Sequence, residues 1–241
     1  TGARQYCEWA GGRLPTEAEW LAEASDLGSR KYAWGNAEPT CDLAVWGGGK
    51  NAAECAVRGS QPVCSKETGR SVSGLCDMSG NVWEWTRSLK APEYTEFGAR
   101  GGAWRDDRVE IRVTYGRSYE PRKRRGYGGF RCVREAGVSG GLEGRSSEAR
   151  LAAAAAGGGG KLGNKSLSGE QGPIGLPGEV GIEWVRSKPG LVTFAKTETT
   201  VAQYRACVEA GVCTVGHHGT KSDDGCCNWG NLRRDDHPMN C

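Results

Sequence analysis

The sequence predicts an α+β fold that contains little regular secondary structure and many turns. Its 241 residues include 39 glycines and 9 tryptophans, a composition typical of turn-rich folds with large aromatic anchors rather than of helical bundles. Stretches with helical spacing and stretches with period-two alternation are both present, and all of them are short. A chain of this length forms one large domain or two small ones.

Two short helices are expected at the beginning of the chain. Residues 3–9 have the pattern of the end of an amphipathic helix, which stops at Gly11-Gly12. Residues 16–19, Thr-Glu-Ala-Glu, match a capping box, in which the Thr16 hydroxyl and the Glu19 carboxylate each accept a hydrogen bond from a free backbone N–H group. We therefore expect this motif to start the second helix and to have a structural role.

The central motif is Gly74-Leu-Cys-Asp-Met-Ser-Gly-Asn-Val-Trp-Glu-Trp85. Alternation predicts a strand with Trp83 and Trp85 on one face and Glu84 on the other. Asp77 and Glu84 flank a tight bend, which gathers carboxylate and carbonyl oxygens of the kind that Ca²⁺ binds. Two interpretations follow: a calcium site, or a hairpin with two solvated acids.

Further strands are expected on both sides of this motif and near the end of the chain. A short aromatic strand is expected at Tyr32–Asn36, and Val109, Ile111 and Val113 alternate as in a strand. Thr200 is a plausible N-cap of a late helix with Val201 and Tyr204 on its apolar face. The expected strands are residues 32–36, 83–85, 99–104, 109–115 and a closing strand led by Phe130, and ordered structure is expected to resume at 181–185.

Composition limits the function classes. The net charge is only +3, so no general affinity for polyanions follows. Eleven cysteines without paired Cys-x-x-Cys knuckles favour disulfides in an oxidising compartment, that is, a secreted, periplasmic or cell-surface protein. No apolar run is long enough to span a membrane, and no signal peptide is visible ahead of Thr1, as in a mature or trimmed chain.

Four motifs resemble those of the formylglycine-generating-enzyme family, also called sulfatase-modifying-factor domains. They are Ala10-Gly-Gly-Arg-Leu-Pro-Thr-Glu-Ala-Glu-Trp20, the central motif, Arg100-Gly-Gly-Ala-Trp104 and Gly129-Phe-Arg-Cys132. The resemblance covers residues 3–134 and implies a decorated C-type-lectin-like fold. It also implies a disulfide between Cys7 and Cys132.

The order of the parts departs from that family. Residues 1–134 resemble the C-terminal part of the family domain, and residues 181–241 resemble its N-terminal part. Between them, residues 135–180 are rich in Gly, Ala and Ser and include collagen-like Gly-x-x triplets, which predicts a flexible linker. Either the domain is circularly permuted, or the chain holds pieces of two tandem domains; we expect 181–241 to pack on 1–134.

The resemblance further implies one calcium site, formed by the side chains of Asp77 and Glu84 and the carbonyls of Gly80 and Val82. A second family site would fall at Ala44 and Val45, where Ala44 lacks a side-chain oxygen. Spacing favours the local disulfides Cys207–Cys213 and Cys227–Cys241. Cys41, Cys55, Cys64 and Cys76 are then left to pair among themselves, and Cys226 is the odd thiol.

Catalysis of the family type is not expected. Active members bind copper(I) through two cysteines, and the corresponding positions here are Asp106 and Ile111, neither of which supplies a thiolate. Copper is therefore not expected. His217, His218 and His237 could hold a transition metal, but exposed histidines are the favoured interpretation.

A binding face is the remaining prediction. Tyr and Arg side chains carry much of the binding energy at interfaces, and they are concentrated between residues 104 and 127. This region is similar to the diversified region of retroelement-varied ligand-binding proteins. The sequence contains no signature of a nucleic-acid-binding module, which argues against nucleic-acid binding. The alternative to a binding face is a solvated basic loop without a ligand. We expect a non-catalytic, calcium-stabilised recognition domain for an unknown protein or small molecule; the alternative is a metal-dependent oxidase of protein cysteines. The predicted face comprises Trp104, Arg105, Asp106, Tyr115, Arg117, Tyr119, Arg122, Arg124, Arg125 and Tyr127.

Overall fold

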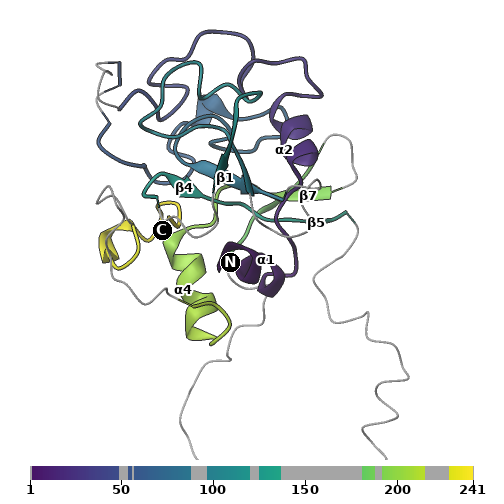
Figure 1. The fold of residues 1–241 in the computed structure, drawn as a ribbon, viewed down its shortest axis with the longest axis vertical. Helices are drawn as coiled ribbons and strands as arrows, with labels where there is room; N and C mark the ends of the chain where they lie inside the picture. The colour runs from purple at the N-terminus through teal and green to yellow at the C-terminus, as the bar shows by residue number, and fades with distance from the viewer. Residues whose placement is uncertain are drawn as a thin grey trace, which may run out of the picture.

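The computed structural model describes residues 2–48, 54–55, 57–87, 97–119, 125–136, 181–187, 192–214 and 228–240. Figure 1 shows short helices and strands joined by long irregular segments, which confirms the predicted α+β fold with little regular secondary structure. The helical elements are α1 (Gly2–Trp9), α2 (Glu17–Ala24), η1 (Glu67–Gly69), α4 (Val201–Glu209) and η2 (Leu232–Arg234). The strands are β1 (Trp83–Thr86), β2 (Phe97–Arg100), β3 (Gly116–Tyr119), β4 (Gly128–Gly129), β5 (Val133–Glu135), β6 (Trp184–Arg186) and β7 (Val192–Ala195).

Side-chain capping fixes where α2 and α4 begin. At α2, the Glu19 N–H donates to Thr16 Oγ1 at 3.2 Å, and the Thr16 N–H donates to Glu19 Oε2 at 2.8 Å. At α4, Thr200 and Gln203 form the same reciprocal pair. Both predicted N-caps are thus confirmed, because each satisfies backbone donors that the first helical turn leaves free.

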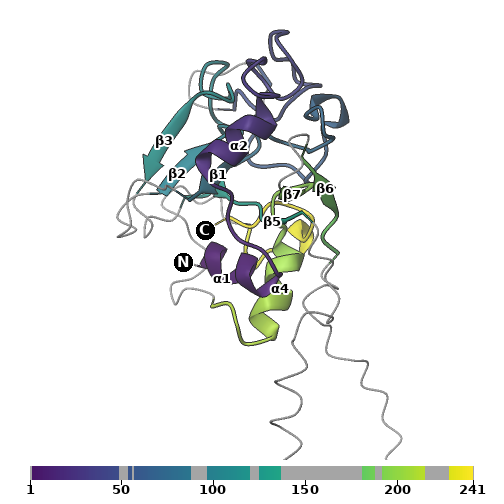
Figure 2. The same ribbon diagram turned by 90° about the vertical axis from the view of Figure 1, so that its right-hand side faces the viewer.

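Two small sheets carry the strands. The first has the order β3-β2-β1-β4, with β1 antiparallel to β2 and parallel to β4. The second has the order β5-β7-β6 and is antiparallel, with Val133 and Val185 both paired to Phe194. Strands from before and after residues 137–180 therefore share one sheet. Helices α1 and α4 lie side by side beneath it in both views (Figures 1 and 2).

The apolar core draws on both parts of the chain. Tyr6 of α1 stacks on Tyr204 of α4, with ring centroids 5.8 Å apart, and meets the edge of Phe130 at 5.6 Å. Trp20 of α2 is fully buried in a second cluster that includes Phe194 of β7. Aromatic side chains bury large apolar areas, so these contacts anchor a fold that has few regular elements.

Residues 109–115 form turns, and the predicted strand is wrong. Asp107 Oδ1 accepts hydrogen bonds from the N–H groups of Val109 (2.7 Å) and Glu110 (3.0 Å). The Ile111 N–H then donates to the Asp107 carbonyl at 3.2 Å, which closes a helix-like turn. Val109 is 42% exposed whereas Ile111 and Val113 are buried. A side-chain cap from Asp107 thus outweighs the β-propensity of the alternating residues.

Two other expected strands also differ from the structure. At Tyr32–Asn36 the chain makes a tight turn, in which Tyr32 and Gly35 exchange backbone hydrogen bonds of 2.9 and 3.0 Å with each other. The strand expected at 99–104 is β2, which ends at Arg100. Gly101 and Gly102 follow it with φ angles of 92° and 70°, in the left-handed region that terminates a strand.

Four disulfides form, in agreement with the pairings expected for these cysteines, including the one implied by the family resemblance. They are Cys7–Cys132, Cys41–Cys55, Cys64–Cys76 and Cys207–Cys213. The expected Cys227–Cys241 pair, the odd Cys226, His217 and His218 lie outside the described residues. So does the expected linker at 135–180 apart from its first two residues, of which Glu135 instead ends β5. In the part of the chain that the structure describes, no helix is both long and apolar enough to cross a membrane.

Candidate functional site

Glu84 lies in a buried ion pair at the centre of the molecule. Alternation along β1 directs its side chain inward, where it is fully buried. Arg131 donates to Glu84 Oε1 through Nη2 at 2.5 Å and to Oε2 through Nε at 2.6 Å, and the Trp20 indole N–H donates to Oε2 at 2.7 Å. Arg131 also donates to the carbonyls of Cys76 (2.8 Å) and Lys196 (3.0 Å). Glu84 is therefore not a solvated acid.

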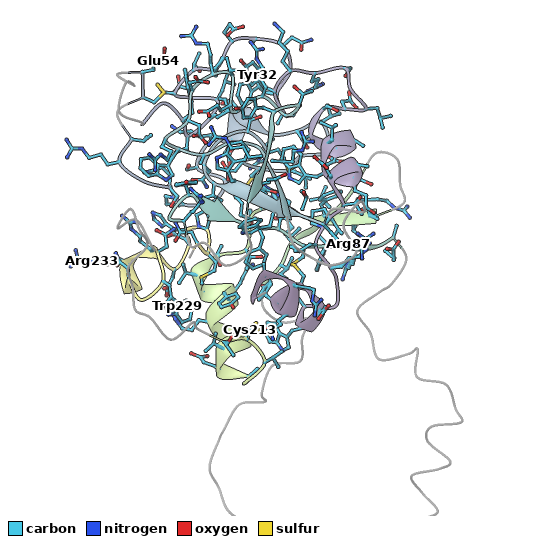
Figure 3. The ribbon with its side chains drawn as sticks, in the orientation of Figure 1. Tyr32, Glu54, Arg87, Cys213, Trp229 and Arg233 are labelled. Carbon is cyan, nitrogen blue, oxygen red and sulfur yellow. A yellow bond between two sulfur atoms is a disulfide. The ribbon has the colours of Figure 1, made fainter. Side chains whose placement is uncertain are left out.

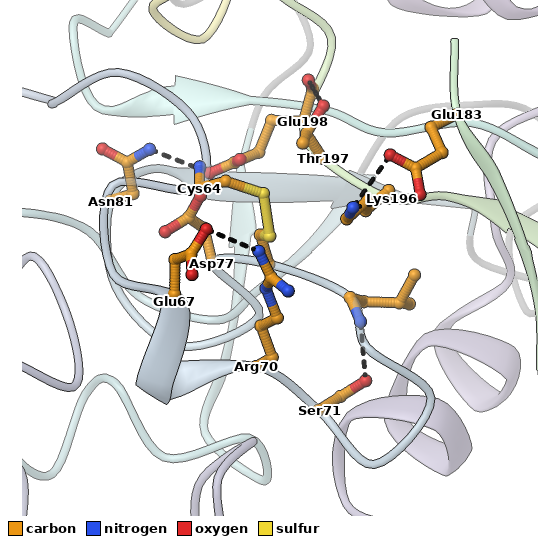
Figure 4. Close-up of a disulfide and its surroundings, with 12 residues drawn as sticks. Cys64, Glu67, Arg70, Ser71, Asp77, Asn81, Glu183, Lys196, Thr197 and Glu198 are labelled. Carbon is orange, nitrogen blue, oxygen red and sulfur yellow. Dashed lines mark hydrogen bonds and ion pairs between the residues drawn. A yellow bond between two sulfur atoms is a disulfide. The ribbon is translucent and has the colours of Figure 1, made fainter.

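Two further buried carboxyl groups adjoin this pair. Asp77 accepts a hydrogen bond from the Cys64 N–H at 2.6 Å, and Glu198 accepts one from the Asn81 side chain at 3.2 Å (Figure 4). Burial and the charge of Glu84 raise the pKa of Asp77 to about 6, although the Cys64 N–H and the Arg131 charge oppose this. Burial and repulsion from Asp77 raise the pKa of Glu198 well above its ordinary value.

Asp77 and Glu84, whose side chains the family resemblance implies as calcium ligands, lie in one buried cluster with Glu198 and Arg131. Three buried carboxyl groups face one guanidinium, so ionisation of all three would leave an excess of negative charge. Glu84 Oε1 accepts one described hydrogen bond and retains a lone pair, and Glu198 Oε2 has no hydrogen-bond partner among the described residues. Within those residues no group of three or more His, Cys, Asp or Glu could hold a metal. The calcium site formed by the Asp77 and Glu84 side chains and the carbonyls of Gly80 and Val82 stays a prediction.

The structure brings several residues of the predicted binding face together. Arg105 lies over the ring of Tyr127, with its guanidinium carbon 4.9 Å from the ring centroid, and Arg125 lies 5.6 Å from the same centroid. Arg117 lies over Tyr115 at 5.8 Å and forms an ion pair with Glu110. We call these five residues, Arg105, Tyr115, Arg117, Arg125 and Tyr127, the basic–aromatic face. Stacking on the rings holds the guanidinium groups at defined positions.

Trp104 and Asp106 of the predicted face are buried, as is Tyr127, which belongs to the same apolar cluster as Trp104. Trp104 is 8% exposed and packs with Trp83 and Ala103 in one apolar cluster. Asp106 is 7% exposed, and its Oδ2 accepts hydrogen bonds from the Trp83 indole (2.6 Å) and the Ala103 N–H (2.9 Å). Burial raises the pKa of Asp106, and these hydrogen bonds together with Arg117 and Arg105 oppose the rise. Both side chains support the face from beneath.

The remaining predicted residues are placed only in part. Tyr119 ends β3, and only its backbone is described. Arg122 and Arg124 lie outside the described residues. His237 binds the Asp236 carboxylate through Nδ1 at 2.9 Å, and its carbonyl accepts the Val201 N–H at 3.0 Å. The contacts of His237 are therefore those of a residue that orders the start of α4.

The two positions that correspond to the copper ligands have structural roles. The Asp106 carboxylate is engaged by Trp83 and Ala103, and Ile111 is fully buried beside Tyr32 and Trp46. No cysteine occurs between Cys76 and Cys132. These residues do not fit copper(I), which prefers soft thiolate ligands.

Sequence reasoning missed Arg131 and Glu198. Arg131 stands in the Gly129-Phe-Arg-Cys132 motif, and that motif was the available signal for a special role. Glu198 directly precedes the Thr199-Thr200 cap of α4 and carries no local signal, because its neighbours Asp77 and Asn81 are more than one hundred residues away in the chain.

Comparison with known proteins gives relatives for this arrangement. The chain is 36% identical over 145 residues to an inactive C-alpha-formylglycine-generating enzyme 2 of Bos taurus, covering 56% of this chain and 48% of that protein. It is 35% identical over 167 residues to a formylglycine-generating enzyme of Streptomyces coelicolor, covering 58% and 52%. It is 34% identical over 152 residues to a hercynine oxygenase of Mycobacterium tuberculosis, covering 54% and 34%. The chain thus spans only about a third to a half of the length of these curated relatives.

The chain is also similar to a solved structure and to a family model. Among solved structures, Treponema denticola variable protein 1 has a TM-score of 0.41 and 26% sequence identity, covering 49% of this chain and 45% of that one. The family model described as the sulfatase-modifying factor enzyme 1-like domain matches residues 1–136, more than half of the sequence. The chain therefore belongs to the sulfatase-modifying-factor family, which includes the formylglycine-generating enzymes.

Proposed function

We propose that the chain is a non-catalytic, calcium-stabilised recognition domain of this family. One observation supports this most directly: the positions expected to bind copper(I) hold Asp106 and Ile111, and both side chains are committed to the core. An oxidase needs its metal ligands and its reacting groups within reach of one another at one site. The relative from Bos taurus, which is named as inactive, is in keeping with the proposal.

Peptide turnover tests the absence of catalysis. A sulfatase-type cysteine peptide is incubated with the chain and copper(I), and formylglycine is measured by mass spectrometry. The formylglycine-generating enzyme of Streptomyces coelicolor serves as the positive control. We expect no product above the level without protein. Formylglycine formed in proportion to the amount of this chain would restore the oxidase alternative.

The proposed ligand contacts the basic–aromatic face. Residues 100–127 contain nine Arg and Lys and four Asp and Glu, a net charge of +5 against +3 for the whole chain. Arg and Tyr are enriched where binding energy is concentrated, and a locally positive surface attracts anionic groups. We propose that the ligand, a protein or a small molecule, presents acidic groups to Arg105, Arg117 and Arg125.

Paired variants test this face. Arg105→Ala combined with Arg125→Ala removes two guanidinium groups and keeps Tyr127, which is only 9% exposed and contributes to the core. Arg233→Ala, at an exposed position on η2, is the matched control (Figure 3). Labelled proteins are applied to arrays of acidic peptides and glycans. We expect the double variant to lose the binding that the control retains; equal binding by both variants would remove the face from the proposal.

Calcium is proposed at Asp77 and Glu84. A ligand that binds only the folded state raises the melting temperature by mass action, so adding Ca²⁺ after EDTA treatment should raise Tm. Asp77→Asn should abolish most of this response, whereas Asp42→Asn, at an exposed position, should leave it unchanged. Equal Tm values in EDTA and in calcium, with no metal in the purified protein, would rule the site out.

We also propose the permuted order and the oxidising location. Helix α1 and the last described part of the chain lie near each other in both views, so a short connection could join the two parts (Figures 1 and 2). Four disulfides are in keeping with a secreted, periplasmic or cell-surface protein. A variant that joins residue 241 to residue 1 and opens the chain within 137–180 should fold with the same Tm. Failure of that variant to fold would favour two tandem pieces.

A further inference from the structure

Two segments of the chain are covalently joined only by residues 137–180. We call them the N-segment (residues 2–136) and the C-segment (residues 181–241). Eight of the eleven cysteines form the four disulfides, and each disulfide lies within one segment. The other three, Cys226, Cys227 and Cys241, all belong to the C-segment. Within one molecule, therefore, no disulfide can link the segments, and their association depends on non-covalent contacts.

Backbone pairing forms the first part of the contact. Strand β5 of the N-segment pairs along its length with β7 of the C-segment, from Val133↔Phe194 to Glu135↔Val192. Hydrogen bonds continue beyond the strands: the Ala195 N–H donates to the Cys132 carbonyl at 2.8 Å. The edge of β5 would be unpaired without the C-segment. An open strand edge is a template for pairing with another chain.

Aromatic side chains form the second part. Tyr6 and Phe130 of the N-segment are buried against Tyr204, and Val201 and Met239 complete the same cluster from the C-segment. Removal of the C-segment would expose this apolar face to water. Burial of apolar side chains is the main favourable contribution to the free energy of association, so covering this face with a C-segment is strongly favourable.

Buried polar groups make the contact specific. The Asn240 side-chain amide donates to the Gly126 carbonyl at 2.6 Å, and the Asn228 amide donates to Ser60 Oγ at 2.9 Å. Arg131 donates to the Lys196 carbonyl, as described above. The Asn240, Asn228 and Arg131 side chains are buried at the boundary between the segments. A foreign segment would leave them without partners, which costs more than the bonds themselves contribute.

We propose that the face of the N-segment that receives the C-segment is a docking surface that accepts this segment from a second copy of the chain as well as from its own. The contacts between the segments are the same whether the C-segment comes from the same chain or from a second copy. The 44 connecting residues reach up to about 150 Å when extended, so they are long enough for the C-segment to bind either N-segment. Tethering gives the chain's own segment an effective concentration on the order of millimolar. Cutting the connection removes that advantage, and pairing between copies then follows mass action.

The test uses the full chain with a protease site inserted within residues 137–180. Two forms are prepared, one with heavy isotopes; each is cleaved, unfolded in urea without reductant, mixed in equal amounts and refolded. Native mass spectrometry should show N-segment and C-segment pairs, about half of them hybrids of the two forms. Cleaved fragments that do not reassociate, complexes without hybrids, or fragments still joined on a non-reducing denaturing gel would each overturn the proposal.

A substitution in the docking contact checks that this face is responsible. Tyr204→Ala removes a 4%-exposed side chain from the shared aromatic cluster and should weaken reassociation of the cleaved segments by about 100-fold or more. Arg233→Ala lies on the same segment at an exposed position and should leave the dissociation constant unchanged. Equal dissociation constants for the two variants would place the association elsewhere and contradict the proposal.

Discussion

Replacing Arg131 with methionine tests how strongly the buried ion pair holds the fold together. The substitution keeps an unbranched side chain of similar length and removes the charge that faces Glu84. It also removes donors from the Cys76 and Lys196 carbonyls. Unlike a surface pair, which is worth little, this pair is fully buried at both ends, so Glu84 would be left as an uncompensated charge in the interior.

The expected loss is large compared with the stability of the domain. Breaking one side of a buried ion pair costs about 3–5 kcal/mol. The buried Cys76 carbonyl, left without its donor, adds about 1–3 kcal/mol, whereas the Lys196 carbonyl still accepts the Cys76 N–H at 2.9 Å. The free energy of unfolding should therefore fall by about 4–8 kcal/mol, against a typical total of about 5–15 kcal/mol for a domain. We expect Arg131→Met to be largely unfolded at 25 °C.

Urea unfolding followed by tryptophan fluorescence measures this loss, in EDTA and without reductant. Arg134→Met is the matched control, since Arg134 lies on β5 of the same segment with its guanidinium over Trp184 at 4.4 Å, and should cost about 0.5–1 kcal/mol. Because Arg131→Met is expected to be unfolded, the double variant Arg131→Met/Glu84→Leu is compared with it. The double variant should recover stability, because the buried charge is gone. An Arg131→Met protein within about 1 kcal/mol of the parent chain would refute this reasoning.

Two further predictions concern the α2 cap and a close backbone contact. Burial opposes ionisation of Glu19, but hydrogen bonds from Arg13 and the Thr16 N–H outweigh it and lower the pKa of Glu19 to about 2. The stability that ionised Glu19 contributes is thus fully present above the unfolded pKa of about 4.3 and is lost as the pH falls through about 2. Between pH 6 and pH 2, the urea midpoint should therefore decline less in Glu19→Gln than in the parent chain. Parallel declines of the two midpoints with pH would contradict this. Gly69→Ala would place a Cβ 1.8 Å from a backbone carbonyl, whereas at Gly128 the nearest atom is 3.8 Å away. Melting should show a clear loss of Tm for Gly69→Ala and little change for Gly128→Ala, and equal Tm values would refute the clash.

Local signals in the sequence predicted local structure well. The Thr16 and Thr200 caps were correct because a capping box is formed by residues three positions apart. The strand at Trp83–Trp85 was correct because alternation reports directly on a strand. The same alternation was misleading at 109–115, where Asp107 caps a turn that a period-two pattern does not reveal.

The candidate site could be predicted only in part. Composition and motifs located the Arg and Tyr side chains between residues 104 and 127, and the structure stacks several of them together. They could not show that Trp104 and Asp106 lie beneath this face, because burial depends on what packs above a residue. Asp106 is buried because Trp83, 23 positions earlier, donates its indole N–H to the carboxylate.

The sequence by itself determined the family motifs, the helix caps, the disulfide-rich character and the absence of thiols at the copper positions, all of which are properties of single residues or short spacings. Only the tertiary structure decided that Glu84 pairs with Arg131, 47 positions away, and that Glu198 approaches Asn81, 117 positions away. Burial removes these charged groups from water, and a buried charge is costly unless it is paired. Which residue forms the pair is determined by the packing of the fold and not by distance along the sequence.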